Sequence, residues 1–207
     1  MRPVSYGEYI PADPPERALP LYLRHPGENY WYEYLAEGKI LYFNYRRCQQ
    51  MKSKPFSAFH KELWAFIDSH EVEKLVVDLR KNRGGSSAIL DQFINTLKKS
   101  SFNREGRLYV IIGKDTYSSG ILNAIRLRKE TVACFVGEPT GGQPNHHGEV
   151  RTFQLPNSKK TIRYSTKYFR WYNQEADTLA PDVEIKESFA AYRKGTDPVL
   201  EWIKQQH

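Results

Sequence analysis

Two adjacent serines, Ser118 and Ser119, stand where a buried strand is followed directly by a helix. Residues 108–112 are continuously apolar, which is typical of a strand that is covered on both faces. From Ile121 the apolar residues take helical spacing. Backbone N–H groups and the helix dipole favour negative charge at such a helix start, so a serine there can serve as a nucleophile. The position also suits a serine that only caps the helix.

A second polar turn, residues 80–86, follows the apolar strand predicted at 73–79. Its two successive glycines, Gly84 and Gly85, let a ligand approach the backbone, and their N–H groups can bind a phosphate or an oxyanion. The turn lacks the Gly-Lys-Ser/Thr ending and the GxGxxG spacing of nucleotide-binding loops. The simpler interpretation is a tight strand-to-helix connection. Asp78 and Arg80 are expected to brace it as an ion pair.

Strands and helices alternate between residues 57 and 136, which predicts an α/β core of parallel strands. Ligands bind at the carboxyl ends of the strands in such sheets, and both polar turns fall at that edge. The sequence therefore predicts that the serines and the glycine pair are neighbours. The predicted strands are 73–79, 108–112 and 131–136, and the predicted helices are 57–69 (with Ser57 as N-cap), 86–99 and 119–129.

Less regular segments flank this core. Residues 1–20 contain five prolines, which predicts an extended N-terminal arm or linker, and residues 21–207 are expected to form one α/β domain. Two hairpins are predicted, and the tyrosines and tryptophan of the first are expected to pack in the core. The predicted hairpins span 29–36 with 40–45 and 149–155 with 160–166; shorter elements are strands at 21–23 and 181–185 and a helix at 197–206.

Composition limits the classes of function. The net charge is +7, but no block of five or six basic residues occurs, so no dedicated nucleic-acid arm is expected. No apolar run is long enough for a transmembrane helix, and residues 1–13 lack the apolar segment of a signal peptide. Cys48 and Cys134 are far apart and cannot form a metal site alone. Neither a metal nor a cofactor is expected.

Four short motifs occur in order along the chain: VDLRKNRGG at 77–85, DTYSS at 115–119, GEPTGG at 137–142 and APDV at 180–183. Together they resemble the C-terminal processing, or tail-specific, serine proteases, a family that includes the catalytic core of tricorn protease. The resemblance covers about residues 35–190. It implies a ClpP/crotonase-like spiral of β-β-α units with a mostly parallel sheet and extra hairpins. It also implies a serine-type peptidase that acts on peptide or protein substrates.

The resemblance assigns roles to individual residues. Ser118 takes the place of the nucleophile, and Ser119 replaces a small residue of the family pattern. The backbone N–H of Ser119 and that of Gly84 or Gly85 would form the oxyanion hole, as acyl transfer requires. The residues expected to contact the substrate are Thr116, Gly141 and Gly142.

The general base is the least defined part of the resemblance. One branch of the family uses a lysine, and Gln143 stands in its place. The tricorn-like branch, which the chain resembles more, uses an upstream histidine and a glutamate before the Pro-Asp motif, where Glu175 stands. No upstream histidine matches. The base is therefore expected to be His146 or His147, or a histidine from a missing N-terminal region or a partner.

Two other functions fit parts of the pattern. A catalytically incomplete module of the same fold would bind a peptide or a hydrophobic ligand, and Gln143 favours this alternative. The Gly-Gly pair, the Thr-x-Ser motif and Glu175 favour the enzyme. An acyl-CoA enzyme shares the oxyanion geometry, but nothing in the sequence indicates a CoA pocket. Family members are often extracytoplasmic, while the sequence itself leaves the compartment open.

Overall fold

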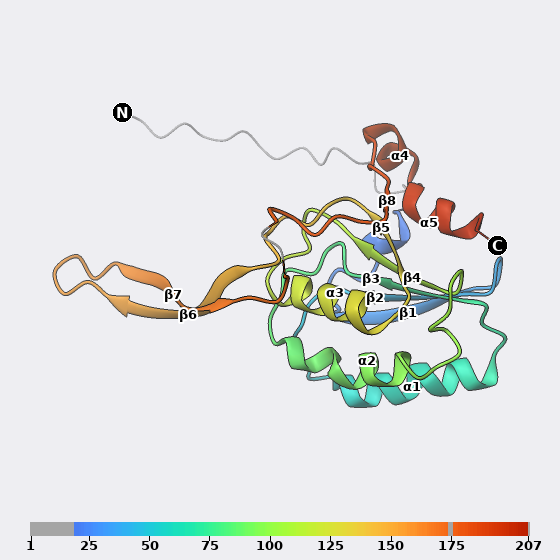
Figure 1. The fold of residues 1–207 in the computed structure, drawn as a ribbon, viewed down its shortest axis with the longest axis horizontal. Coiled ribbons are helices and arrows are strands. Elements are labelled where there is room, and N and C mark those ends of the chain that lie inside the picture. The colour runs from blue at the N-terminus through green and yellow to red at the C-terminus, as the bar shows by residue number, and fades with distance from the viewer. Residues whose placement is uncertain (1–18, 174–175, 207) are drawn as a thin grey trace.

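A six-stranded sheet forms the centre of the molecule (Figure 1). The computed structural model describes residues 19–173 and 176–206. β1 (Tyr30–Leu35) and β2 (Ile40–Tyr45) form the first predicted hairpin and pair antiparallel. All later neighbours pair parallel, which confirms the predicted mostly parallel α/β core. The order is β1-β2-β3-β4-β5-β8, with β3 (Lys74–Asp78), β4 (Leu108–Ile112), β5 (Cys134–Gly137) and β8 (Val183–Glu184).

Helices cover both faces of this sheet, which explains why its strands are continuously apolar. Side chains on one face pack against α1 (Phe56–Ser69), α2 (Asp91–Leu97) and α3 (Ser119–Glu130). Side chains on the other face pack against the 3-10 helix η1 (Leu21–Leu23) and α5 (Pro198–Lys204). Neighbouring residues of one strand divide between the two cores, as Phe43 and Tyr42 of β2 do. The aromatic residues Tyr30 and Trp31 are buried, as predicted.

Several boundaries differ from the sequence prediction. Residues 21–23 form a 3-10 turn instead of a strand, closed by the hydrogen bonds Leu23 N to Pro20 O and Arg24 N to Leu21 O. Ser57 does not cap α1, because the helix already begins at Phe56 and its N-cap is Pro55. The helix predicted at 86–99 is a 3-10 segment, η2 (Ser87–Leu90), followed by α2.

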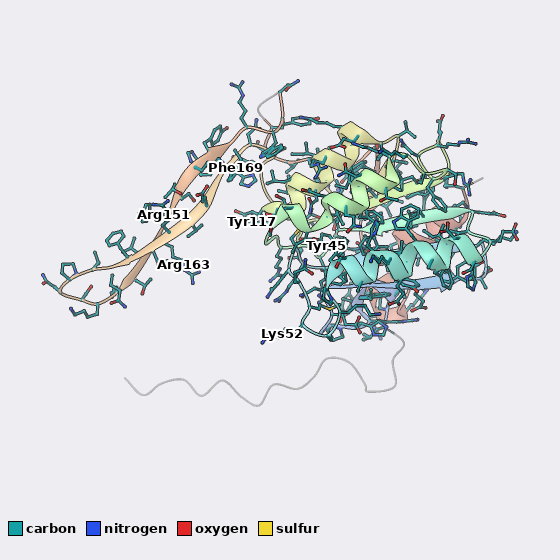
Figure 2. The ribbon with its side chains drawn as sticks, turned by 90° about the horizontal axis from the view of Figure 1, so that it is seen from below. Tyr45, Lys52, Tyr117, Arg151, Arg163 and Phe169 are labelled. Atoms are coloured by element: carbon teal, nitrogen blue, oxygen red, sulfur yellow. The ribbon has the colours of Figure 1, made fainter. Side chains whose placement is uncertain are left out.

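The second predicted hairpin extends away from the body (Figures 1 and 2). β6 (His146–Gln154) and β7 (Thr161–Phe169) pair antiparallel with each other and form a separate two-stranded sheet. Near the C-terminus, α4 (Phe189–Lys194), which the sequence did not predict, follows β8. Within the described residues, no helix is both long enough and apolar enough to span a bilayer.

Candidate active site

The two polar turns meet at the carboxyl edge of the sheet, as predicted. β3 and β4 are parallel neighbours, so the turns that follow them lie side by side. Tyr117 N donates to Asn82 O at 2.8 Å, and Asp115 binds both Lys81 Nζ (3.0 Å) and Arg83 Nη2 (2.9 Å). Burial raises the pKa of the Asp115 carboxyl, but the hydrogen bonds from these two cations outweigh burial and lower it. A backbone hydrogen bond and two ion pairs thus hold the two turns together.

Ser118 adopts a backbone conformation that is unusual for a residue with a side chain. Its φ is 52° and its ψ is −125°, and it occupies the N-cap position of α3. The side chain is half-buried and makes no capping hydrogen bond, so capping does not account for this serine. A non-glycine residue at positive φ costs on the order of 1–3 kcal/mol and persists only where neighbouring structure holds it. Strained strand-to-helix turns are also where nucleophilic serines are displayed.

Gly84 provides the space beside this serine. It has φ +97°, and a Cβ on it would lie 2.8 Å from Ser118 Cβ and 3.2 Å from Ser118 Oγ. Its N–H donates to Asn82 Oδ1 at 2.9 Å. Asn82 is fully buried and is anchored by its own Nδ2, which donates to Tyr45 O at 2.8 Å. The Gly84 N–H is therefore already occupied, although the sequence offered it equally with Gly85 as an oxyanion donor.

Gly85 lies directly on the backbone of Cys48. Its φ is +134°, and a Cβ on it would approach Cys48 O to 2.2 Å, so only glycine fits. Cys48 N donates to Gly84 O (3.0 Å) and Ser86 N donates to Cys48 O (2.7 Å), which fixes the loop on both sides. Within the described segments, neither the Gly85 N–H nor the Ser119 N–H donates to another protein group.

The Ser119 side chain links the helix start to the glycine loop. Its Oγ donates to Gly85 O at 2.6 Å, and the residue is buried. Close packing continues at Gly120, where a Cβ would meet Asn82 O at 2.6 Å. The start of α3 and the glycine loop are therefore held in one fixed arrangement. The sequence predicted that Ser119 lies beside the nucleophile. It did not predict the hydrogen bond from the Ser119 hydroxyl to Gly85 O, because residues 34 positions apart leave no pattern in the sequence.

Thr116 is fully buried beneath the turn. Its Oγ1 donates to Leu79 O at 2.8 Å and accepts from Gly113 N at 3.0 Å. These bonds tie the end of β3 to the turn after β4. The Thr116 side chain is therefore used within the protein, where it holds the two turns together, and the substrate contact expected from the resemblance stays a prediction.

The loop that contains Gly141 and Gly142 packs against the serine turn. A Cβ on Gly141 would lie 1.9 Å from Lys114 O, and one on Gly142 would lie 2.6 Å from the Tyr117 ring. Thr140 Oγ1 donates to Gly142 O at 2.9 Å and shapes the loop from within. Both glycines are thus required by close packing at the edge of the site.

The candidate bases follow this loop as the first two residues of β6, whereas the sequence predicted them in the loop itself. His146 Nδ1 is 3.0 Å from Gln143 O, and its ring packs near Phe169. His147 is exposed, and its ring lies 4.8 Å from that of Tyr168. Within the described parts of the chain, neither histidine hydrogen-bonds Ser118. Gln143 Nε2 donates to Asp177 Oδ1 at 3.3 Å. Glu175 lies outside the described residues.

A buried arginine fixes the start of the glycine loop from the opposite side. Arg80 binds Asp78 through Nε (2.8 Å) and binds Asp197 through both terminal nitrogens (3.0 and 2.7 Å). Asp197 also caps α5 by accepting from Val199 N and Leu200 N. The predicted ion pair of Asp78 and Arg80 is confirmed. The partner Asp197 was not predicted, because a contact across 117 positions leaves no pattern in the sequence.

Other features lie apart from Ser118. A cavity of about 890 Å³ is lined by residues of β1, α1 and the segment 50–54, but not by Ser118. Cys48 is buried, which raises the pKa of its thiol to about 11 and keeps it protonated at neutral pH. Within the described residues, no group of three or more His, Cys, Asp or Glu side chains is arranged to hold a metal ion.

Comparison with known proteins relates this geometry to solved structures. No protein-family model and no curated protein sequence matches the chain. A peptidase candidate from Parabacteroides merdae superposes with a TM-score of 0.63 at 18% identity, over 84% of this chain and 62% of the other. The photosystem II D1 C-terminal processing protease gives 0.51 at 14% identity, over 77% and 48%. Tricorn protease gives 0.55 at 19%, over 81% and 17%.

These similarities concern the arrangement of the backbone. The chain spans less than two thirds of the length of the first two of these proteins and a sixth of the length of tricorn. Their shared features are a mixed α/β body, a mostly parallel central sheet and an added antiparallel hairpin. The chain therefore has the fold of the C-terminal processing proteases.

Proposed function

We propose that the chain is a serine-type peptidase domain of the tail-specific protease family. It would hydrolyse peptide bonds through an acyl-enzyme intermediate on Ser118. The observation that carries this proposal is the backbone of Ser118, with φ 52° and ψ −125° and a hydroxyl that makes no capping bond. Strain of this kind is retained where function requires it. The fold, which the chain shares with solved proteases, supports the same assignment.

The neighbouring amides suit the chemistry of acyl transfer. Ser118 Oγ attacks the peptide carbonyl carbon, and the carbonyl oxygen becomes an oxyanion. The Gly85 and Ser119 N–H groups, which have no protein acceptor among the described residues, are the proposed donors to this oxyanion. The general base takes the hydroxyl proton of Ser118 and passes it to the leaving amine as the C–N bond breaks, which leaves an ester on Ser118. Water, deprotonated by the same base, then attacks the ester carbonyl, and Ser118 regains its proton as the acid product leaves. Loss of one such donor lowers the rate by about a hundredfold or more.

His146 is the proposed general base. A backbone carbonyl only accepts, so the contact of His146 Nδ1 with Gln143 O assigns the ring proton to Nδ1. The other ring nitrogen, Nε2, then carries the lone pair that a base needs. His146 follows Gly142 by four residues, and Gly142 packs on Tyr117, the residue before Ser118, which is why His146 is preferred as the base. Glu175 is the proposed partner that orients the base, as in the tricorn-like branch, and His147 is the substitute base.

Labelling with a fluorophosphonate probe tests the nucleophile. We expect the wild-type chain to be labelled and the Ser118→Ala chain to be silent, with equal circular dichroism spectra. Ser119→Ala is the matched control, because it removes the adjacent hydroxyl but keeps the backbone N–H. Labelling that survives Ser118→Ala but is lost in Ser119→Ala would transfer the nucleophile to Ser119.

The base is tested separately. Replacement of His146 by Gln keeps a polar side chain but removes the basic nitrogen, so labelling should slow by a factor of about 10²–10⁴. His147→Gln tests the alternative base in the same assay. An unchanged rate in both variants would assign the base to a group outside the described residues or to a partner.

The second candidate function is a non-catalytic module of this fold that binds a peptide or a hydrophobic ligand. Gln143, which stands in the lysine position, bonds to Asp177 and cannot take a proton at neutral pH. Wild-type protein that folds normally but is never labelled would favour this module.

A further inference from the structure

The β6–β7 hairpin carries charge of nearly one sign. Between residues 146 and 169 the chain has five Lys and Arg side chains but a single acid, Glu149. The five cations are Arg151, Lys159, Lys160, Arg163 and Lys167. None of them forms an ion pair with any residue that the structure describes. In the body, by contrast, Lys39 binds both Glu71 and Glu73, and Arg126 binds Glu130. Lys167 Nζ lies over the Phe169 ring, 5.0 Å from its centroid, and no described carboxylate pairs with any of the five cations.

The same hairpin exposes large apolar side chains. The exposed fractions of the side chains are 60% for Val150, 49% for Phe153 and 46% for Tyr164, whereas most aromatic residues of the central sheet are buried. The Phe153 and Tyr164 rings meet edge to face at 5.9 Å and form a small apolar platform. Single exposed apolar residues are ordinary, but several on one projecting arm indicate a contact surface.

Both outer edges of the hairpin lack a neighbouring strand. β6 and β7 form a two-stranded sheet, so each nine-residue strand has one edge whose N–H and C=O groups meet no other strand in the described structure. Such an edge is a template for an additional strand, and isolated two-stranded hairpins are only marginally stable. Only a polypeptide can continue this backbone hydrogen-bond ladder.

We propose that the β6–β7 hairpin is a docking site for an acidic polypeptide segment, which adds to one edge of the hairpin as a further strand. The backbone edge supplies affinity, the apolar platform receives alternate side chains, and the cations select carboxylates. A nucleic acid would use the cations but would leave the strand edges unpaired, so a polypeptide fits more of the surface. The inference goes beyond the proposed peptidase function, because binding needs neither Ser118 nor a base.

The location of the hairpin adds a geometric consequence. Its base lies at His146 and Phe169, beside the loop whose Gly142 packs on Tyr117 (Figure 2). Arg151 and Arg163 lie further out along the arm (Figure 2). The end of a bound strand that reaches the base of the hairpin therefore lies beside the turn that carries Ser118.

Fluorescence anisotropy with a fluorescein-labelled, nine-residue peptide of alternating Glu and Thr tests this surface. The full chain carries Ser118→Ala, so that cleavage cannot alter the probe. The companion probes are the same peptide with Lys in place of Glu, the acidic peptide N-methylated at alternate residues, and a short single-stranded DNA. N-methylation removes strand hydrogen bonds but retains the charge.

We expect saturable binding of the acidic peptide, weakened about tenfold by the double variant Arg151→Glu/Arg163→Glu. The control variant, Lys61→Glu/Lys99→Glu, changes the net charge equally at exposed positions of the body and should bind as the parent does. The N-methylated and Lys-containing peptides should bind much more weakly. Circular dichroism and thermal unfolding verify that both double variants are folded.

Four results would overturn the proposal. They are absence of binding by the acidic peptide, equal binding of the N-methylated peptide, stronger binding of the DNA, and equal losses in the hairpin and body variants. Labelling of Ser118 is measured on the wild-type chain in a separate assay. Failure of the peptidase proposal and failure of the docking proposal are therefore distinguished.

Discussion

Gly84 and Ser118 pack so closely that a single methyl group cannot be placed between them. A Cβ on Gly84 would lie 2.8 Å from Ser118 Cβ and 3.0 Å from Ser119 N. Real Cβ atoms essentially never approach heavy atoms within 3.0 Å, so one of the two turns would have to move. The displayed serine and the glycine loop are consequently one structural unit.

Gly84→Ala is the first test of this unit. The substitution adds the clashing methyl and also forces a side chain into φ +97°, so we expect a loss of about 1–3 kcal/mol in unfolding free energy. Fluorophosphonate labelling should fall further than this loss of stability explains. Gly27→Ala is the control, because a Cβ there meets nothing within 4 Å. Wild-type labelling by Gly84→Ala would contradict the proposed coupling.

Ser119→Ala removes the hydroxyl that binds Gly85 O. We expect a loss of about 0.5–1.5 kcal/mol in unfolding free energy, the usual net value of a hydrogen bond. Because the backbone N–H remains, substrate hydrolysis should persist with a lower kcat and a nearly unchanged KM. Urea unfolding and steady-state kinetics measure the two effects. A change confined to KM would instead place the Ser119 hydroxyl in substrate binding.

Arg80→Met tests the buried link to α5. The variant leaves Asp78 and Asp197 buried without their cation, and removal of one member of a buried ion pair costs about 3–5 kcal/mol. Arg83→Met is the matched control, because its side chain is 74% exposed and its ion pair with Asp115 should contribute less than about 1 kcal/mol. Thermal unfolding compares the two variants. Similar losses from both would show that the buried network is not a main source of stability.

His60 provides a prediction about pH. The residue is buried on α1 near Phe93, and burial lowers the pKa of its imidazole. The unfolded chain therefore takes up a proton near the ordinary pKa of about 6.5, while the folded chain does so only at lower pH. The contribution of the neutral imidazole to the free energy of unfolding is therefore complete above the unfolded-state pKa of about 6.5, and it declines as the pH falls below that value.

Urea unfolding at about pH 7.5 and about pH 5.5 measures this effect. We expect His60→Leu to lose less unfolding free energy between the two values than the wild type does. An identical loss in both proteins would assign the acid sensitivity to other groups.

The sequence predicted the central strands and the meeting of the two turns because these depend on local patterns. The run 108–112 is apolar at every position since it supplies both cores, and the helix after it begins at Ser119, as expected. The predictions of hairpin ends and helix caps were less accurate. At α1, Pro55 already has the extended backbone of an N-cap, which leaves Ser57 inside the helix.

Details of the site depend on contacts between distant residues. Which glycine N–H is available is decided by the Asn82 side chain, and the sequence does not show where that side chain points. The motif placed Thr116 near the site, but only the folded chain shows that it is buried. Glu175 lies outside the described residues, so its role stays a prediction. Arg80 and Asp197 meet only because α5 returns to the sheet.

The length of the β6–β7 hairpin has a consequence for kinetics. Nine residues per strand, at about 3.3 Å each, give the arm a reach of about 30 Å from the body. A polypeptide tethered along it would meet Ser118 at an effective concentration set by the span between the two points of attachment, in the millimolar range for short flexible connections. Long acidic chains would then react at bulk concentrations far below those that short peptides require.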